Sequence, residues 1–157
     1  GYHRALKDVD WSADRWDAEL QALSPRISYH RRNREKLSEL NRVGTVHLHA
    51  AGESWVLRLN DSSLERVDAE ILQTLVFEGL FGIEDARNDP KLTYIPGTMS
   101  SAELIAHCDE QTGRCIFEMS PMSSAQIKST ADRGGFLPPK SSWIEPKLRS
   151  GLFIHEI

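Results

Sequence analysis

The sequence predicts an α+β fold, a single sheet that contains a hairpin and has about four helices packed on it. Residues 43–59 hold two alternating segments separated by a turn, which is the pattern of a β-hairpin. Residues 67–81 carry a wide apolar stripe at helical spacing, which is typical of a helix that covers a sheet. With 157 residues the chain is long enough to bury a core, so we expect residues 1–157 to form one structural unit.

The first quarter of the chain is expected to hold an extended segment, a helix and a short strand. If residues 2–8 are extended, His3, Ala5 and Lys7 face one way, and the residues between them face the other way. Ser12 can cap a helix that runs to about residue 23 and is stopped by Pro25. Residues 26–30 are expected to form a strand. The highly charged residues 31–40 are compatible with either a helix or a loop.

The hairpin and the helix after it have the clearest periodicity. Residues 43–50 and 54–59 alternate on either side of a turn at 51–53. Asp68 is a plausible cap for the helix that follows, and Gly82 has the usual position of a residue that ends a helix. The second strand has Trp55, Leu57 and Leu59 on one face, and the helical stripe consists of Ile71, Leu72, Leu75, Val76, Leu80 and Phe81.

Strands and helices continue to alternate to the end of the chain. Ser100 and Glu103 have the spacing of a capping box, which predicts a helix start. The remaining expected elements are a strand over 92–95, a helix to about Asp109, a strand over 114–119, a helix from Ser123 or Ser124 to Arg133, and a strand over 152–157.

Composition and charge exclude several classes of protein. A net charge of −4 and a pI of about 5.9 argue against broad nucleic-acid or membrane binding. No apolar run approaches the length of a membrane span, and we expect no signal peptide at the start of the chain. The low cysteine content favours a reducing, cytoplasmic setting. Cys108 and Cys115 are too few for a disulfide scaffold. Cys108 follows His107, but adjacent helical residues face apart, so we do not expect a reactive pair.

Two groups of polar residues have alternative interpretations. His47 and His49 share one face of an expected strand, and with Glu53 in the following turn they could bind a metal. The other interpretation is a polar strand face, which we favour, so that we predict no metal site. The basic residues between Arg26 and Lys36 are interpreted as a solvated face, with phosphate contact as the alternative. The sequence contains no P-loop and no GxSxG, HExxH or GxGxxG motif.

The proline-rich segment 134–151 is the most distinctive part of the chain. Three of the seven prolines lie within nine residues, beside a glycine pair, and this restricts the backbone. Cations and hydroxyls on such a backbone suit an anion such as phosphate or carboxylate. The alternative is a loop that only joins a helix to the last strand. The residues expected to bind the anion are Lys140, Ser141, Ser142 and Lys147.

Several segments together resemble the C-terminal part of the bacterial domain-of-unknown-function family numbered 1015. The most specific block is Leu137-Pro138-Pro139-Lys140-Ser141-Ser142-Trp143-Ile144-Glu145-Pro146-Lys147, followed by Ser150-Gly151-Leu152. The other matching segments are residues 64–72 and 80–83, Leu92-Thr93-Tyr94 with Gly97, and Met119-Ser120-Pro121. Residues 2–8 resemble the middle region of that family, which has Asn where this chain has His3.

The resemblance implies that this chain is the C-terminal portion of a longer protein. Full-length members carry an upstream Gly-His-His-Arg motif similar to that of ParB-like and sulfiredoxin-like proteins, a group that includes free serine kinases. It further implies a small anionic or amino-acid-like ligand, the upstream part of the same protein as a partner, and a nucleotide with Mg²⁺ as cofactor. The positions it points to are Arg4 and Lys7 as anion ligands, Asp8 as a base or as a metal-side carboxylate, and Lys140, Ser141 and Lys147 in the proline-rich segment.

Two functional hypotheses remain open from the sequence. In the first, the chain contributes an anion-binding loop to a phosphotransferase-like enzyme that is complete only in the longer protein. In the second, it is a structural or assembly module whose loop packs on the upstream part or on a second subunit. Loss of ligand binding in Lys140→Ala without loss of folding would favour the first hypothesis.

Overall fold

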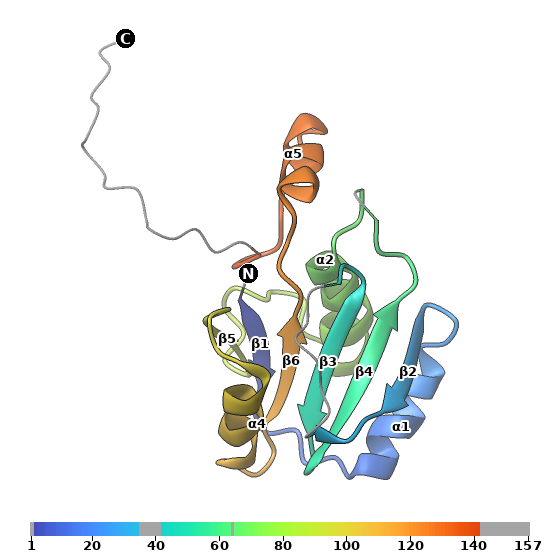
Figure 1. The fold of residues 1–157 in the computed structure, drawn as a ribbon, viewed down its shortest axis with the longest axis vertical. Coiled ribbons are helices and arrows are strands. Elements are labelled where there is room, and N and C mark those ends of the chain that lie inside the picture. Colours follow the sequence, from blue (N-terminus) through green and yellow to red (C-terminus); the bar gives the residue numbers. More distant parts are fainter. Residues whose placement is uncertain (1, 35–41, 64, 142–157) are drawn as a thin grey trace, which may run out of the picture.

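A computed structural model describes residues 2–34, 42–63 and 65–141, and these form one six-stranded sheet with helices on both faces. The strands are β1 (His3–Leu6), β2 (Ile27–Arg31), β3 (Thr45–Ala50), β4 (Glu53–Leu59), β5 (Leu92–Ile95) and β6 (Cys115–Met119). Their order across the sheet is β2-β4-β3-β6-β1-β5, and every neighbouring pair is antiparallel (Figure 1). The α+β fold with a single sheet is therefore confirmed.

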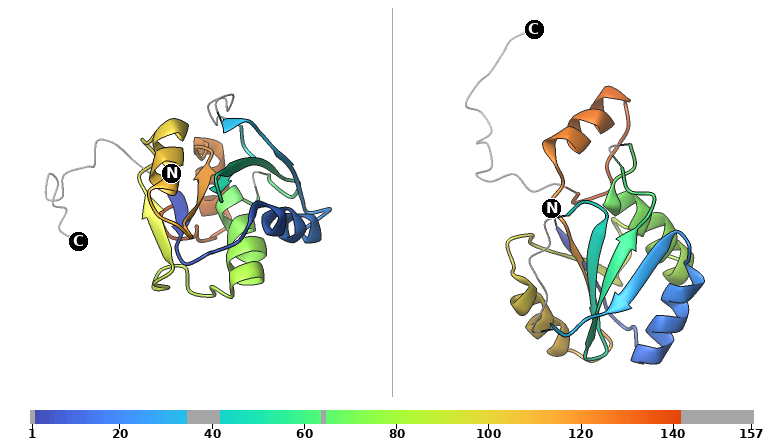
Figure 2. Two further views of the ribbon diagram at one scale, coloured as in Figure 1. Left: turned by 90° about the horizontal axis from the view of Figure 1, so that it is seen from below. Right: turned by 45° about the vertical axis from the view of Figure 1, so that its right-hand side comes forward.

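One face of the sheet packs against the larger part of the core. Helix α1 (Ala13–Ala22) and the helical stretch from Asp68 to Phe81 lie on this face, opposite α4 in the edge-on view of Figure 2. Alternate residues of the strands supply the sheet side of this core. The largest fully buried side chains include Trp16, Trp55, Phe77 and Phe117, and Phe77 meets Phe117 edge to face at 5.4 Å between ring centroids.

Among the described residues, the opposite face of the sheet is covered by a single helix, α4 (Ser101–Asp109), and its apolar cluster is small (Figure 2). That cluster consists of Ala5, Ile95, Leu104, Cys108 and Ile116, with Met99 at its edge. Beside it, the same face buries polar side chains of β1, β3 and β6. Side chains alternate between the two faces along a strand. Phe117 of β6 therefore faces the apolar core, and Glu118 faces this side.

The helix expected over residues 67–81 is present, with two differences from the prediction. Its first turns, α2 (Asp68–Leu72), and its last, α3 (Gly79–Phe81), are α-helical, but η2 (Gln73–Glu78) between them is π-helical. The prediction that Asp68 caps this helix is wrong, because Val67 is the N-cap residue. The Asp68 carboxylate accepts hydrogen bonds from the Gly44 N–H at 2.9 Å and from the Ser62 hydroxyl, so it ties the helix to the start of β3. Gly82 ends the helix at φ 67°.

The other caps follow the sequence closely. Ser12 accepts from the Arg15 N–H at the start of α1, and Ser100 and Glu103 form the capping box of α4. Ser123, one of the two candidates, caps α5 (Ser124–Asp132), which projects beyond the end of the sheet (Figure 1). Within the described ranges, no helix has the length and apolar character needed to cross a membrane. The strand expected over 152–157 and most of the segment 31–40 lie outside the described residues.

Candidate metal centre

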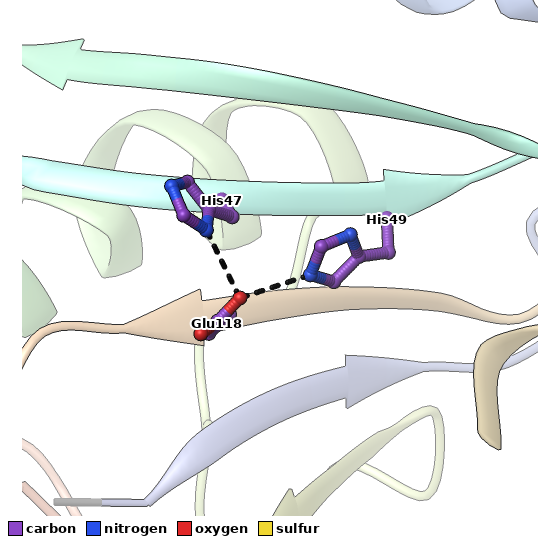
Figure 3. A group of neighbouring side chains, drawn as sticks. All are labelled: His47, His49 and Glu118. Carbon is purple, nitrogen blue, oxygen red and sulfur yellow. Dashed lines mark hydrogen bonds and ion pairs between the residues drawn. The ribbon is translucent and has the colours of Figure 1, made fainter. Parts of the chain in front are cut away.

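Three buried side chains converge on the face of the sheet that α4 covers. His47 and His49 are alternate residues of β3, and Glu118 lies on the neighbouring strand β6, directly opposite His47 in the register. One carboxylate oxygen, Oε2, lies 3.0 Å from His47 Nδ1 and 3.0 Å from His49 Nε2 (Figure 3). One ligand atom from each of the three side chains lies within 4.8 Å of the other two. The register of β3 and β6 therefore brings two histidines and a carboxylate from distant parts of the sequence to one point.

The Glu118 carboxylate is ionised and well satisfied although it is buried. Its second oxygen, Oε1, accepts a hydrogen bond from the Ser101 hydroxyl at 2.7 Å, at the start of α4. Burial alone would raise the pKa of Glu118, but the hydrogen bonds from His47, His49 and Ser101 outweigh it and hold the pKa well below its usual range. Glu118 therefore carries a negative charge at neutral pH.

The hydrogen bonds of His49 define the proton position on its ring. Nε2 faces the Glu118 carboxylate, which only accepts, so Nε2 carries the proton in the network shown in Figure 3. Nδ1 accepts from the Ser54 hydroxyl at 2.8 Å, on the adjacent strand β4. Burial lowers the pKa of His49, against the opposing effect of Glu118, so the ring is neutral. A neutral imidazole is the form that binds a metal ion.

A third histidine lies on the same face of the sheet. His3 is the first residue of β1, and its Nδ1 accepts a hydrogen bond from the backbone N–H of Met119 at 3.0 Å. Its Nε2 atom is buried and has no hydrogen-bond partner among the described residues. Burial lowers the pKa of His3 to about 4, against the opposing effect of Glu118. The ring is therefore neutral at physiological pH.

A cleft of about 290 Å³ opens next to the cluster. Its wall includes His3 and Glu118 on the sheet and Ser101 at the first turn of α4. The rest of the wall comes from Gly97, Thr98, Met99, Ser100, Met119 and Pro121. This volume is at the lower end of the range for small-molecule sites. Glu118 is thus the residue that connects the histidine cluster to the cleft.

The cluster has the composition of a metal site. In a tetrahedral zinc centre with bonds of about 2.1 Å, neighbouring ligand atoms lie about 3.4 Å apart. The two nitrogen–oxygen distances of 3.0 Å need only a small widening to reach this value. The carboxylate of the cluster is Glu118 and not Glu53, which the sequence offered as a possible ligand. Glu53 lies opposite Ala50 in the hairpin and is not part of the cluster. The sequence contains one signal for Glu118 as a ligand, which we did not use. It is the one charged residue inside the apolar run 115–119.

The structure separates the residues expected to bind an anion into two groups. Arg4 and Ser141 line one small cavity, and the Arg4 guanidinium donates to the Pro139 carbonyl at 3.3 Å. Lys140 is exposed, with its Nζ 5.2 Å from the centre of the Tyr2 ring. The other described members, Lys7 and Asp8, are exposed at the opposite end of β1. Ser142 and Lys147 lie outside the described residues.

Arg26, Arg31 and Arg34 of the basic run make ordinary surface ion pairs. Arg31 contacts Asp14 and Asp17 at 3.1 and 2.6 Å. Arg34 contacts Asp109 at 2.7 Å. These contacts support the solvated-face interpretation, because Arg26, Arg31 and Arg34 each already have a carboxylate partner.

The two cysteines are buried and free. The Cys108 thiol donates to the His49 carbonyl at 3.2 Å, and burial raises the pKa of Cys108 to about 11. A thiol of such high pKa is a poor nucleophile at neutral pH. A reactive Cys108 is therefore not supported.

Comparison of the chain with protein-family models, with curated proteins and with solved structures gave no match. The resemblance to the family numbered 1015 therefore stays a prediction.

Proposed function

We propose that this chain binds one divalent transition-metal ion through His47, His49 and Glu118, and that Zn²⁺ fits this ligand set. The observation that carries the proposal is the convergence of His47, His49 and Glu118 at a buried point, with one ligand atom of each within 4.8 Å of the other two. Two histidines and one carboxylate are a common ligand set of catalytic zinc sites, in which a fourth position holds water or substrate.

The surroundings of the three ligands support the proposal. Metal-binding histidines and carboxylates are usually held by further hydrogen bonds, which orient them and increase their basicity. Ser101 already holds the second oxygen of Glu118. When His49 Nε2 binds a metal, its proton moves to Nδ1, where the Ser54 oxygen is in place at 2.8 Å to accept it. Two of the three ligands thus have an outer partner of the right chemical type.

The proposed chemistry is metal-assisted hydrolysis or hydration of a small molecule. A zinc ion with three protein ligands lowers the pKa of its bound water to near neutrality and polarises a carbonyl oxygen. Because Glu118 lines the cleft beside His3 and Ser101, the proposal places the open metal position on the cleft side. The bound metal supplies the nucleophile or the Lewis acid, and the chain holds the substrate oxygen next to it.

The test is Zn²⁺ binding by the purified chain after treatment with a chelator. We expect one equivalent of Zn²⁺ to bind in competition with a chromophoric chelator, and Glu118→Gln and His47→Ala to lose more than about 100-fold in affinity. The same substitutions at residues of α4 outside the cluster, Glu103→Gln at an exposed residue and His107→Ala at a half-buried one, serve as matched controls and should keep the wild-type affinity.

A self-contained hydrogen-bonded cluster is the alternative to a metal centre. It predicts no Zn²⁺ binding above the level of the Glu118→Gln variant, and that result would exclude the proposal. Far-UV circular dichroism of each variant shows whether a lost affinity reflects a lost fold.

A second candidate function, anion binding, is favoured by one residue. Arg4 is only 3% exposed, and within the described part of the chain its guanidinium contacts no carboxylate. Burial lowers the pKa of Arg4 to about 10, so it stays charged. A buried cation without an acidic partner is costly unless a ligand or another group neutralises it. The phosphotransferase-like hypothesis requires an anion-binding site of this kind beside Lys140 in the proline-rich segment.

Phosphate binding tests this second function. Calorimetric titration with inorganic phosphate at low and high salt should show salt-sensitive binding that is weakened in Lys140→Ala. Lys128→Ala, on the exposed side of α5, is the matched control. Equal phosphate affinity in the two variants would leave the loop as a structural connector.

A further inference from the structure

The hydrogen bond from Met119 to His3 determines what the other nitrogen of that ring can do. A backbone N–H can only donate, so His3 Nδ1 must present a lone pair at 3.0 Å. The single proton of the neutral ring is then on Nε2. His3 Nε2 can therefore donate a hydrogen bond but cannot accept one.

This donor is left without a partner inside the protein. His3 is 5% exposed, and Nε2 is a buried atom that makes no hydrogen bond to any described residue. A buried donor without an acceptor is costly, and such groups are rare in folded proteins unless a ligand or water satisfies them. Because His3 lines the cleft beside Glu118, an acceptor bound in the cleft can supply the missing bond.

The same tautomer excludes His3 as a fourth metal ligand. A metal ligand must present a lone pair, and here the lone pair is used by Met119. His3 lies close enough to interact electrostatically with both Glu118 and His49. Its donor is thus adjacent to the metal centre without being part of it.

The charges around the cleft decide which acceptor fits. The Glu118 carboxylate repels an anion when no metal is bound, and a divalent ion at the cluster reverses the sign to a net positive charge. The cleft also reaches the first turn of α4 at Ser101, where the helix N-terminus favours negative charge. An anionic oxygen ligand is therefore favoured only in the metal-bound chain.

We propose that the cleft binds the carboxylate group of a small molecule, with one oxygen at the metal and another accepting a hydrogen bond from His3 Nε2. This inference rests on the proposed metal centre. His3 is then a substrate-positioning donor that stays neutral, comparable to the neutral histidines that polarise oxygen atoms in other enzymes.

Two substitutions of His3 separate its two nitrogens. In His3→Asn the amide oxygen can replace Nδ1 as the acceptor for Met119, but nothing reaches the position of Nε2. In His3→Gln the longer amide can place an N–H near Nε2, but the acceptor for Met119 is lost. The first variant therefore removes the donor to the cleft, and the second keeps it.

The experiment measures acetate binding to the Co²⁺-loaded chain by visible absorption. We expect Zn²⁺ and Co²⁺ affinities in both variants to equal those of the wild type. Acetate affinity should fall about tenfold in His3→Asn, the effect of losing one hydrogen bond, and should stay close to wild type in His3→Gln. Thr74→Ala, at an exposed residue of η2 on the other face of the sheet, is the control and should keep its acetate affinity.

Each alternative result overturns a specific step. If the chain binds the metal but wild type and His3→Asn have equal acetate affinities, the role of His3 is overturned and the metal centre is not. Metal affinity lost in His3→Asn makes His3 a ligand and overturns the tautomer argument. Absence of metal binding in the wild type overturns both proposals. A nitrogen-15 spectrum of the imidazole rings in the metal-free chain tests the first step independently, because a proton on His3 Nδ1 would contradict it.

Discussion

Phe117 and Glu118 are neighbours on β6 but belong to two different kinds of interior. Phe117 is fully buried and meets Phe77 and Trp16 on the face that α1 and the long helix cover. Glu118 is 5% exposed and meets two histidines and a serine on the face under α4. A displacement of one residue along the strand thus separates apolar packing from a charged, hydrogen-bonded cluster.

The comparison shows how one sheet can serve two purposes. Large apolar side chains on the first face contribute stability in proportion to the area that they remove from water. Buried charges on the second face contribute little net stability, because the cost of desolvation opposes their favourable contacts. A chain that keeps such groups next to a cleft has the features of a binding site, since perturbed ionisable groups cluster at functional sites.

The strongest test of the comparison is Phe117→Ala. Removing a fully buried aromatic side chain should lower the free energy of unfolding by about 3–5 kcal/mol, measured by urea denaturation. Ile127→Ala, at a residue of α5 that is 39% exposed, should change it by less than about 0.5 kcal/mol. A loss below about 1 kcal/mol in Phe117→Ala would mean that the apolar face is not the main source of stability.

The pH dependence of stability tests the polar face. Burial lowers the pKa of His3 from 6.5 to about 4, so between these values the unfolded chain binds a proton that the folded chain does not. Stability should therefore fall as the pH decreases from about 6.5 to 4, by about 3 kcal/mol from His3 alone. His49, whose pKa burial also lowers, acts in the same direction.

The matched variant for this effect is His3→Asn, which has no ionisable group at position 3. Its free energy of unfolding should change less than that of the wild type over the same pH range, measured by urea denaturation at several pH values. Parallel pH profiles of the two proteins would show that His3 is protonated as easily in the folded chain as in the unfolded chain.

Ser101→Ala is the mildest change to the proposed metal centre. The hydroxyl at 2.7 Å from Glu118 orients a ligand without being one, so its loss should weaken Zn²⁺ binding about 10- to 100-fold and leave the fold intact. Thr98→Ala, on the same cleft wall, should have no such effect. Unchanged Zn²⁺ affinity in Ser101→Ala would mean that the position of the Glu118 carboxylate does not depend on α4.

The local elements could be read from the sequence because their causes are local. The capping box at Ser100 and Glu103 uses residues three apart, and the hairpin turn at Ala51 and Gly52 follows from the alternation on both sides of it. The π-helical segment was not predictable, because the apolar stripe over 67–81 has the same appearance for an α-helix with or without an inserted π turn.

Taken by itself, the sequence determined the fold class, most element boundaries and the fact that His47 and His49 share one face of a strand, since side-chain alternation needs no tertiary information. The tertiary structure alone decided what completes the cluster. Glu118 is separated from His47 and His49 by 71 and 69 residues, and it meets them because β6 pairs with β3. Strand order and register depend on packing over the whole sheet, and periodicity within a segment carries no information about them.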